Sequence, residues 1–251
     1  MKKFSPSLKM KNAVLAGALS LVLGNAQATL FDRGGGLIFD DVLNVTWLQN
    51  ANLAATQGFG IASKGAVESS FQFGIAPNGS MNFNTAYNWI SAMNNAVYLG
   101  YSDWRLPTTM QPDSTCSFQG SRSSGYNCTG SEMGSLYYTG LGNQNAVIDP
   151  LTNNLISYEH ETKTGPFKNL QSNLYWSSTE YKPDSSNYVL SFFNGNQGDY
   201  QGPYGNLYAM ALRGGDSTFI SAVPEPETYA MMLAGLGLMG FMARRRKNIT
   251  S

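Results

Sequence analysis

Two apolar runs, one near each end of the 251-residue chain and each flanked by basic residues, limit which part of the sequence can fold in water. Residues 1–28 carry four lysines and no acid, and residues 244–247 read Arg-Arg-Arg-Lys. The segment between them, 29–222, holds eight basic and fourteen acidic residues, a net charge of −6. We therefore expect one folded domain at 29–222 with a targeting segment on each side.

The first 28 residues have the three parts of a secretory signal peptide. A lysine-rich start precedes an apolar stretch at 13–23, and Ala26-Gln27-Ala28 offers a small-x-small cleavage site. An N-terminal anchor helix is the alternative, but this stretch would reach only about 16 Å as a helix, against a hydrocarbon core of about 30 Å. We predict cleavage between Ala28 and Thr29.

The C-terminal tail also has three parts in a fixed order. The stiff motif 223–227 contains Pro224-Glu225-Pro226, the apolar run 229–243 follows, and the basic cluster 244–247 comes last. A helix over the apolar run would be about 22 Å long, which is short for a permanent span, and the arginines would stay cytoplasmic. We expect a short transmembrane helix that anchors a precursor in the inner membrane; an ordinary tail anchor is the alternative.

This tail resembles the PEP-CTERM sorting signal of Gram-negative bacteria. The resemblance implies that an exosortase, a membrane-embedded cysteine transpeptidase or protease, recognises residues 223–247 and cleaves near the Pro-Glu-Pro motif. It further implies a final location at the cell surface or in the extracellular matrix. The same signal accompanies exopolysaccharide production and the formation of biofilm or floc.

The body predicts an α+β domain with a mainly antiparallel sheet. The apolar segments 37–39 and 45–48 are expected to form a hairpin around a five-residue loop. Further strands are expected at 175–178, 188–193 and 207–212. The last two flank a loop rich in Gly, Asn and Gln, which predicts that they pair with each other in antiparallel fashion.

One or two helices are expected in the front half of the domain. The segment 85–99 is the clearest, with Asn84 as its N-cap and Gly100 at its end. A second, shorter helix is predicted at 50–57. Apolar residues of the first helix recur at helical spacing, which predicts one buried face formed by Ala86, Trp89, Ile90, Met93 and Val97.

Several motifs of the domain resemble those of the Lcl C-terminal domain family, long listed as a domain of unknown function. They run from residue 37 to residue 215 and include Asp103-Trp104-Arg105-Leu106-Pro107-Thr108, Tyr175-Trp176-Ser177-Ser178-Thr179 and Ala211-Leu212-Arg213-Gly214-Gly215. The Arg-Leu-Pro-Thr and Arg-Gly-Gly elements are also similar to sulfatase-modifying-factor domains. That similarity implies a C-type-lectin-like fold, but their catalytic cysteines have no counterparts here.

The charged residues of these motifs are better suited to architecture than to ligand binding. Asp103 and Arg105 flank Trp104, and we expect them to form a buried ion pair that fixes the loop, with Pro107 setting its exit. Arg213 is expected to take a similar role near the other end of the domain. A buried arginine favours a carboxylate that it can bind with two hydrogen bonds.

Cys116 and Cys128 are the only two cysteines, and we predict that they form a disulfide. An exported chain reaches an oxidising compartment, and the Ser- and Gly-rich segment between them permits ring closure. Two unpaired thiols are the alternative. A redox-active pair is not expected, because the sequence has no Cys-x-x-Cys motif.

No catalytic or metal-binding motif stands out, so we do not expect an enzyme. The single histidine, His160, lies between two glutamates, and the sequence has no nucleophile elbow and no distinctive carboxylate pair. No metal or cofactor is predicted; calcium bound by the Asn- and Asp-containing loops 194–199 and 149–154 is the less favoured alternative to plain turn formation. The acidic body also argues against nucleic acid as a partner.

The composition of the body suits a glycan, because it is poor in charge and rich in aromatic, amide and hydroxyl side chains. Aromatic rings stack on sugar faces, and amides and hydroxyls meet sugar hydroxyls. The candidate binding residues lie in one late loop: Asn194, Asn196, Gln197, Tyr200 and Tyr204. On composition alone, Tyr and Asn that simply furnish loops and sheet surface are the better explanation. The two family resemblances, both linked to extracellular polysaccharide or glycan adhesion, favour a surface or matrix protein that associates with exopolysaccharide, and the acidic body suits a neutral glycan. A secreted carbohydrate-active enzyme and a purely structural matrix protein are the alternatives.

Overall fold

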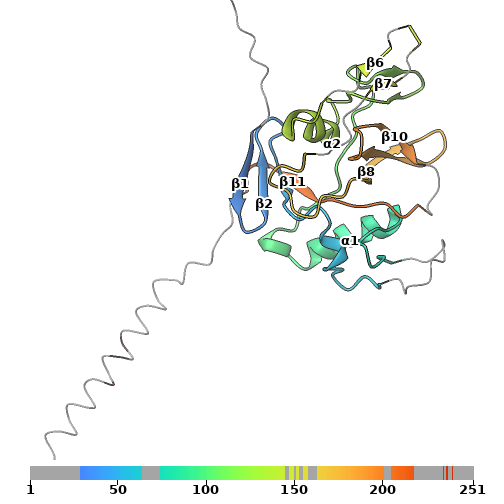
Figure 1. Cartoon of the computed structure of the whole chain (residues 1–251). Coiled ribbons are helices and arrows are strands. Elements are labelled where there is room, and N and C mark those ends of the chain that lie inside the picture. Colours follow the sequence, from blue (N-terminus) through green and yellow to red (C-terminus); the bar gives the residue numbers. More distant parts are fainter. Residues whose placement is uncertain are drawn as a thin grey trace, which may run out of the picture.

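The computed structural model describes residues 29–63, 74–144, 147–149, 151–152, 155–157, 163–200 and 205–217, together with Ala234, Leu236 and Met239. Across this part of the chain the predicted α+β class with mainly antiparallel sheets is confirmed. Figure 1 shows the strands of the two larger sheets, among them β1, β2, β11, β8 and β10, as a central layer with α1 (Phe83–Asn95) and α2 (Glu132–Ser135) on opposite sides of it.

The first sheet has the strand order β1-β2-β3-β11, and all its pairs are antiparallel. Its strands are β1 (Leu30–Gly34), β2 (Leu37–Asp40), β3 (Val45–Leu48) and β11 (Leu212–Gly214). The predicted hairpin between β2 and β3 is confirmed, with Ile38 opposite Trp47. The sheet therefore joins the beginning of the domain to its end.

The second sheet has the order β10-β9-β8, from β8 (Leu174–Tyr181), β9 (Ser186–Ser191) and β10 (Gln197–Tyr200). The predicted pairing of 188–193 with 207–212 is wrong. β9 pairs with β8 on one side and with β10, which forms inside the expected loop, on the other. Segment 207–212 instead crosses the domain and ends in β11, where it pairs with β3.

Helix α1 begins two residues before the predicted start. Asn82, not Asn84, is its N-cap, and the Asn82 side chain accepts a hydrogen bond of 2.8 Å from the Thr85 backbone N–H. The helix ends at Asn95, because Val97 takes a left-handed conformation (φ 48°) and opens a short 3-10 turn at Tyr98–Gly100. The buried helical face is confirmed except at Val97, which is exposed.

The other local elements are short. The expected helix at 50–57 is only a 3-10 turn at Leu53–Ala55. Helix α2 continues into a π-helical turn at Leu136–Gly140, which the sequence pattern did not predict. Two small ribbons complete the described part of the chain: β4 (Phe118–Gln119) with β5 (Ser123–Ser124), and β6 (Val147–Ile148) with β7 (Leu155–Ser157).

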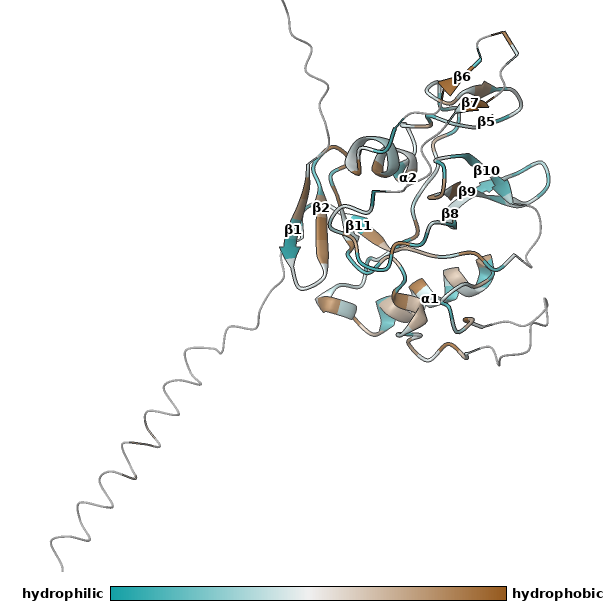
Figure 2. Cartoon of the chain, viewed as in Figure 1, coloured by the Kyte–Doolittle hydropathy of each residue, from teal (hydrophilic) through white to brown (hydrophobic). Residues whose placement is uncertain are grey.

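The central strands are buried on both faces, so the domain has two cores. One core packs α1 against the strands, and the other packs α2 and the π-helical turn against their opposite face. Segment 207–212 shows this directly, because Ala209 and Ala211 belong to the α1 core while Tyr208, Met210 and Leu212 belong to the α2 core. Burial on both sides explains why β2 has three apolar residues in succession, Leu37, Ile38 and Phe39, which give it its brown colour in Figure 2.

The two ends of the domain lie together. Arg33 in β1 pairs with Asp216 just after β11, with N–O distances of 2.9 and 2.6 Å, and the Arg33 guanidinium lies over the rings of Phe31 and Phe39. The Thr46 hydroxyl donates to the Gly215 carbonyl at 2.7 Å. These contacts fix the chain at the point where it leaves the domain toward the C-terminal tail.

Several predictions fall on residues outside the described part of the chain. They are the signal peptide 1–28, the Pro224-Glu225-Pro226 motif and the basic cluster 244–247. Of the apolar run 229–243, only Ala234, Leu236 and Met239 are described, and they are helical. Among the described residues, no helix has both the length and the apolar character needed to cross a membrane. The signal peptide, the transmembrane helix and the C-type-lectin-like fold stay predictions.

Candidate functional site

The extended segment 103–109 connects the two sheets and α2, and it forms one wall of the candidate site. The Arg105 backbone N–H donates to the Leu212 carbonyl at 2.8 Å, and the Leu212 N–H donates back to the Arg105 carbonyl at 3.0 Å. Arg105 thereby lies beside β11, at the edge of the first sheet. The Arg-Leu-Pro-Thr motif therefore begins as an additional piece of sheet.

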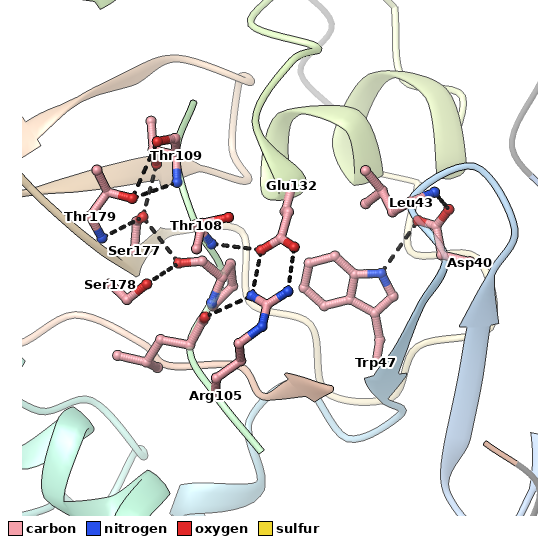
Figure 3. A network of polar contacts seen from close by, with 12 residues as sticks. Asp40, Leu43, Trp47, Arg105, Thr108, Thr109, Glu132, Ser177, Ser178 and Thr179 are labelled. Atoms are coloured by element: carbon pink, nitrogen blue, oxygen red, sulfur yellow. Dashed lines mark hydrogen bonds and ion pairs between the residues drawn. The ribbon is translucent and has the colours of Figure 1, made fainter. Parts of the chain in front are cut away.

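Arg105 forms an ion pair with Glu132, the first residue of α2, and not with Asp103 as predicted. Its two terminal nitrogens donate to the two carboxylate oxygens at 2.7 and 2.6 Å, and the Thr108 backbone N–H adds a third bond of 2.7 Å (Figure 3). Burial alone would raise the pKa of Glu132, but the hydrogen bonds from Arg105 and Thr108 outweigh it and hold this pKa below its ordinary value.

Asp103 also has a distant partner. The Arg213 guanidinium donates to both Asp103 oxygens at 2.7 and 3.0 Å, and it lies 4.0 Å from the centre of the Tyr101 ring. It donates as well to the Ser217 hydroxyl. The structure thus places both motif arginines in architectural ion pairs, but each pair joins segments far apart in the sequence.

The Pro107 carbonyl connects this segment to β8. Ser178 donates to it through its backbone N–H at 2.8 Å and through its hydroxyl at 3.1 Å, and the Ser177 hydroxyl donates at 3.1 Å. Thr109 continues the contact by donating to Ser177 and Thr179 (Figure 3). These bonds replace the pairing with β9, which shifts register between Trp176 and Glu180. The shift leaves Ser178 exposed at the surface next to α1.

A groove runs between α1 and β8, and we call it the α1–β8 groove. Its first part, the Arg105 lobe, encloses about 320 Å³, and its second part, the Glu180 lobe, about 410 Å³. Both volumes fall in the range of small-molecule sites, roughly 300–1,000 Å³. The lobes adjoin at Tyr87 and Ser178, which line both. The other lining residues are Ile90, Ser91, Asn94, Asn95, Trp104, Arg105 and Leu106 in the first lobe, and Phe83, Asn84, Glu180, Ser185 and Asn187 in the second.

The groove combines one exposed ring with many amides and hydroxyls. Tyr87 is 64% exposed on the outer face of α1, the most exposed of the large aromatic residues in the described part of the chain. Asn94 is already used by the fold, since it bonds both the N–H and the carbonyl of Trp104. Of the binding residues predicted from the sequence, none that the structure describes lies in this groove. The signal available in the sequence was Tyr87 itself, an aromatic residue on the polar face of an amphipathic helix.

The predicted binding residues lie elsewhere, and none of those described lines the groove. The Tyr200 ring packs edge-on against Trp176 at 5.7 Å, and Gln197 is buried beside Cys116. Asn194 accepts a hydrogen bond from the Asn196 backbone N–H at 3.1 Å, as in a simple turn. Tyr204 lies outside the described residues. A role for these residues in glycan binding stays a prediction.

The predicted disulfide between Cys116 and Cys128 is present, with Cα atoms 4.1 Å apart. Asp113 lies close to both sulfurs, but these sulfurs are bonded to each other and are not thiolates. The Asp113 carboxylate already accepts hydrogen bonds from Thr115 and from the Gly130 backbone N–H. This cluster therefore fits a structural role better than a metal site.

The acids of the two loops considered for calcium are used within the fold. Asp199 pairs with Arg122 at 2.8 Å and accepts a hydrogen bond from the Ser186 hydroxyl. Asp149 accepts from the Leu151 backbone N–H at 2.9 Å. Asn153, Asn154 and the single histidine, His160, lie outside the described residues.

Comparison with known proteins assigns both parts of the chain. Residues 222–247 match the PEP-CTERM protein-sorting motif, which supports an exosortase-sorted protein that acts outside the cytoplasm. No curated protein and no solved structure matches the chain. Residues 36–213 match the Lcl C-terminal domain. Segment 103–109 and the part of β8 that is hydrogen-bonded to it therefore lie inside the matched region. The chain belongs to the Lcl C-terminal domain family.

Proposed function

We propose that the exported domain binds a glycan in the α1–β8 groove and thereby associates with exopolysaccharide at the cell surface or in the matrix of a biofilm or floc. The sorting motif supports a location at the cell surface or outside the cell, because this motif is typical of exported proteins that an exosortase processes. The groove supports the activity. Its size suits sugar units, and its lining offers one ring, several amides and several hydroxyls.

The exposed ring of Tyr87 is the observation that carries this proposal. A tyrosine on the outer face of a helix gains nothing from the core, but it offers an apolar face on which the C–H face of a sugar stacks. Tyr87 lines both lobes, so a chain of sugar units would pass over it from one lobe to the other. Asn84, Asn95 and Asn187 would then meet sugar hydroxyls on either side.

Binding fits the groove better than hydrolysis does. Most glycoside hydrolases use two carboxylates on either side of the bond that they cleave. Among the described residues that line the groove, Glu180 is the single carboxylate, and Arg105 is held by Glu132. We therefore propose a binding protein and not an enzyme.

A glycan array probed with the exported protein tests the proposal. Tyr87→Ala should weaken binding to the retained glycans by about tenfold, since stacking and burial at an exposed ring contribute on the order of 1–2 kcal/mol. Phe118→Ala is the matched control, because Phe118 is an exposed ring on β4 that does not line the groove. Both variants should keep the wild-type melting temperature within a few degrees.

Two results would contradict the proposal. If no glycan is retained, or if Tyr87→Ala and Phe118→Ala bind equally well, the groove is not the glycan site. Release of shorter products from matrix polysaccharide, lost in Glu180→Gln, would instead identify a carbohydrate-active enzyme. A protein that binds nothing but persists in purified matrix would fit a purely structural role.

A further inference from the structure

We propose that the Glu180 lobe is a subsite for a protonated amino sugar; this inference rests on the proposed function, glycan binding in the α1–β8 groove. The glycan that the groove takes would then be a polysaccharide with unacetylated amino groups, and not an entirely neutral one. The charge and the position of Glu180 carry this inference.

Glu180 lies near the end of β8, opposite Asn187 of β9. Its side chain is exposed in a lobe of about 410 Å³, together with Tyr87 and the amide of Asn84. Within the described part of the chain, no hydrogen bond or ion pair engages its carboxylate. This carboxylate therefore differs from the ones in Glu132, Asp103 and Asp199, which are all held by arginines.

The neighbouring charges leave the lobe anionic. Arg105 lies in the other lobe, and its guanidinium is already neutralised by Glu132. The turn between β8 and β9 carries one charge of each sign, Lys182 and Asp184, and the Asp184 carboxylate accepts hydrogen bonds from Ser186. The net charge of −6 on segment 29–222 adds to the same sign. A carboxylated or sulfated sugar would meet repulsion in this lobe.

An ammonium group matches the carboxylate, the two amides and the exposed ring of this lobe. It donates charge-assisted hydrogen bonds to a carboxylate, and it donates to the amide oxygens of Asn84 and Asn187. It is also attracted to the face of an aromatic ring, which Tyr87 provides. An acetylated amino group has no charge and gains neither the ion pair nor the cation–π contact. The lobe thus distinguishes two forms of the same sugar.

The test compares two probes that differ only in acetylation: the β-1,4-linked tetrasaccharides of glucosamine and of N-acetylglucosamine. The exported protein is titrated with each at pH 6 and low salt, by calorimetry. We expect the glucosamine tetrasaccharide to bind about fivefold more tightly, which equals about 1 kcal/mol for an exposed ion pair with a ring contact. The preference should shrink as salt is raised from 50 to 300 mM.

Glu180→Gln should reduce this preference to about twofold or less, because only the contact with the Tyr87 ring remains, and leave the affinity for the acetylated tetrasaccharide unchanged. Asp41→Asn is the matched control, because Asp41 is an exposed carboxylate on the β2–β3 turn, outside the groove. Equal affinities for the two probes, or a preference that is undiminished in Glu180→Gln, would overturn the inference but leave the proposed function intact. If neither probe binds, the inference is also overturned. The glycan array then decides the proposed function separately, according to whether any glycan is retained and lost in Tyr87→Ala.

Discussion

Replacing Glu132 by glutamine tests whether its ion pair with Arg105 holds segment 103–109 to α2. Glutamine keeps the shape, and its oxygen can still accept from one Arg105 nitrogen and from the Thr108 N–H. Its amide then faces the second Arg105 nitrogen, so one charge-assisted hydrogen bond and the charge are lost, worth about 1.5–3 kcal/mol. The Arg105 side chain is 39% exposed, so water replaces part of this interaction.

We therefore expect Glu132→Gln to lower the free energy of unfolding by about 2 kcal/mol at pH 7, and the melting temperature by about 4–8 °C. The loss should depend on pH. Because the pKa of Glu132 is lowered in the folded protein, its stabilisation is complete above the ordinary value of 4.5 and is lost as the pH falls through the folded-state pKa. At pH 3.5 the difference between the two proteins should be smaller by about 1 kcal/mol.

Urea unfolding followed by tryptophan fluorescence measures both quantities, because the four tryptophans are buried in the fold. Glu180→Gln is the control, since its carboxylate is exposed and lies outside the network of Figure 3. It should change the stability by less than about 0.5 kcal/mol at either pH. A Glu132→Gln variant as stable as the wild type at pH 7, or equally destabilised at both pH values, would refute the assigned role of the pair.

Three further outcomes are expected. Replacing Cys116 and Cys128 together by serine should lower the free energy of unfolding by about 3 kcal/mol, and wild-type protein assayed with reductant should lose the same amount. Gly134→Ala should cost more than about 2 kcal/mol in a thermal melt, because a Cβ there overlaps the Cys128 carbonyl oxygen, whereas Gly214→Ala, with open space around it, should cost less than about 0.5 kcal/mol. In an exosortase-bearing host, alanines in place of Pro224-Glu225-Pro226 should leave the tail on the protein, and mass spectrometry should find Thr29 at the N-terminus in both forms.

The sequence patterns predicted the local helices and strands well. They did not predict which strands pair with each other or which charged side chains form ion pairs. The buried face of α1 follows from spacing alone, so Trp89 and Met93 were placed correctly. The cap was misplaced because Asn82 and Asn84 are the same residue type, two positions apart. The pairing of β9 was missed because β10 is polar and has no strand pattern, which its teal colour in Figure 2 shows.

The groove could not have been predicted as a whole, because it is assembled from segments that are distant in the sequence. α1 supplies Tyr87, segment 103–109 supplies Arg105, and the irregular part of β8 supplies Ser178. The ion pairs of Arg105 and Asp103 were mispredicted for the same reason, because their true partners are distant in the sequence. Asp103 and Arg105 are neighbours in sequence, yet β11 brings Arg213 to one of them and α2 brings Glu132 to the other.

The ion pair between Arg33 and Asp216 holds the two ends of the domain together. A mechanical pull on the C-terminal tail therefore acts first at this one site, next to β1 and β11. The load meets this pair first, together with the bonds from Thr46 to the chain around Gly215, and then β11, which it would separate from β3 one residue pair at a time. The Glu180 lobe is built from α1, β8 and β9, and none of these pairs with β11. A pull that is absorbed at β11 therefore acts outside the walls of this lobe, and only a pull that passes β11 would reach the bonds between Tyr208 and β8.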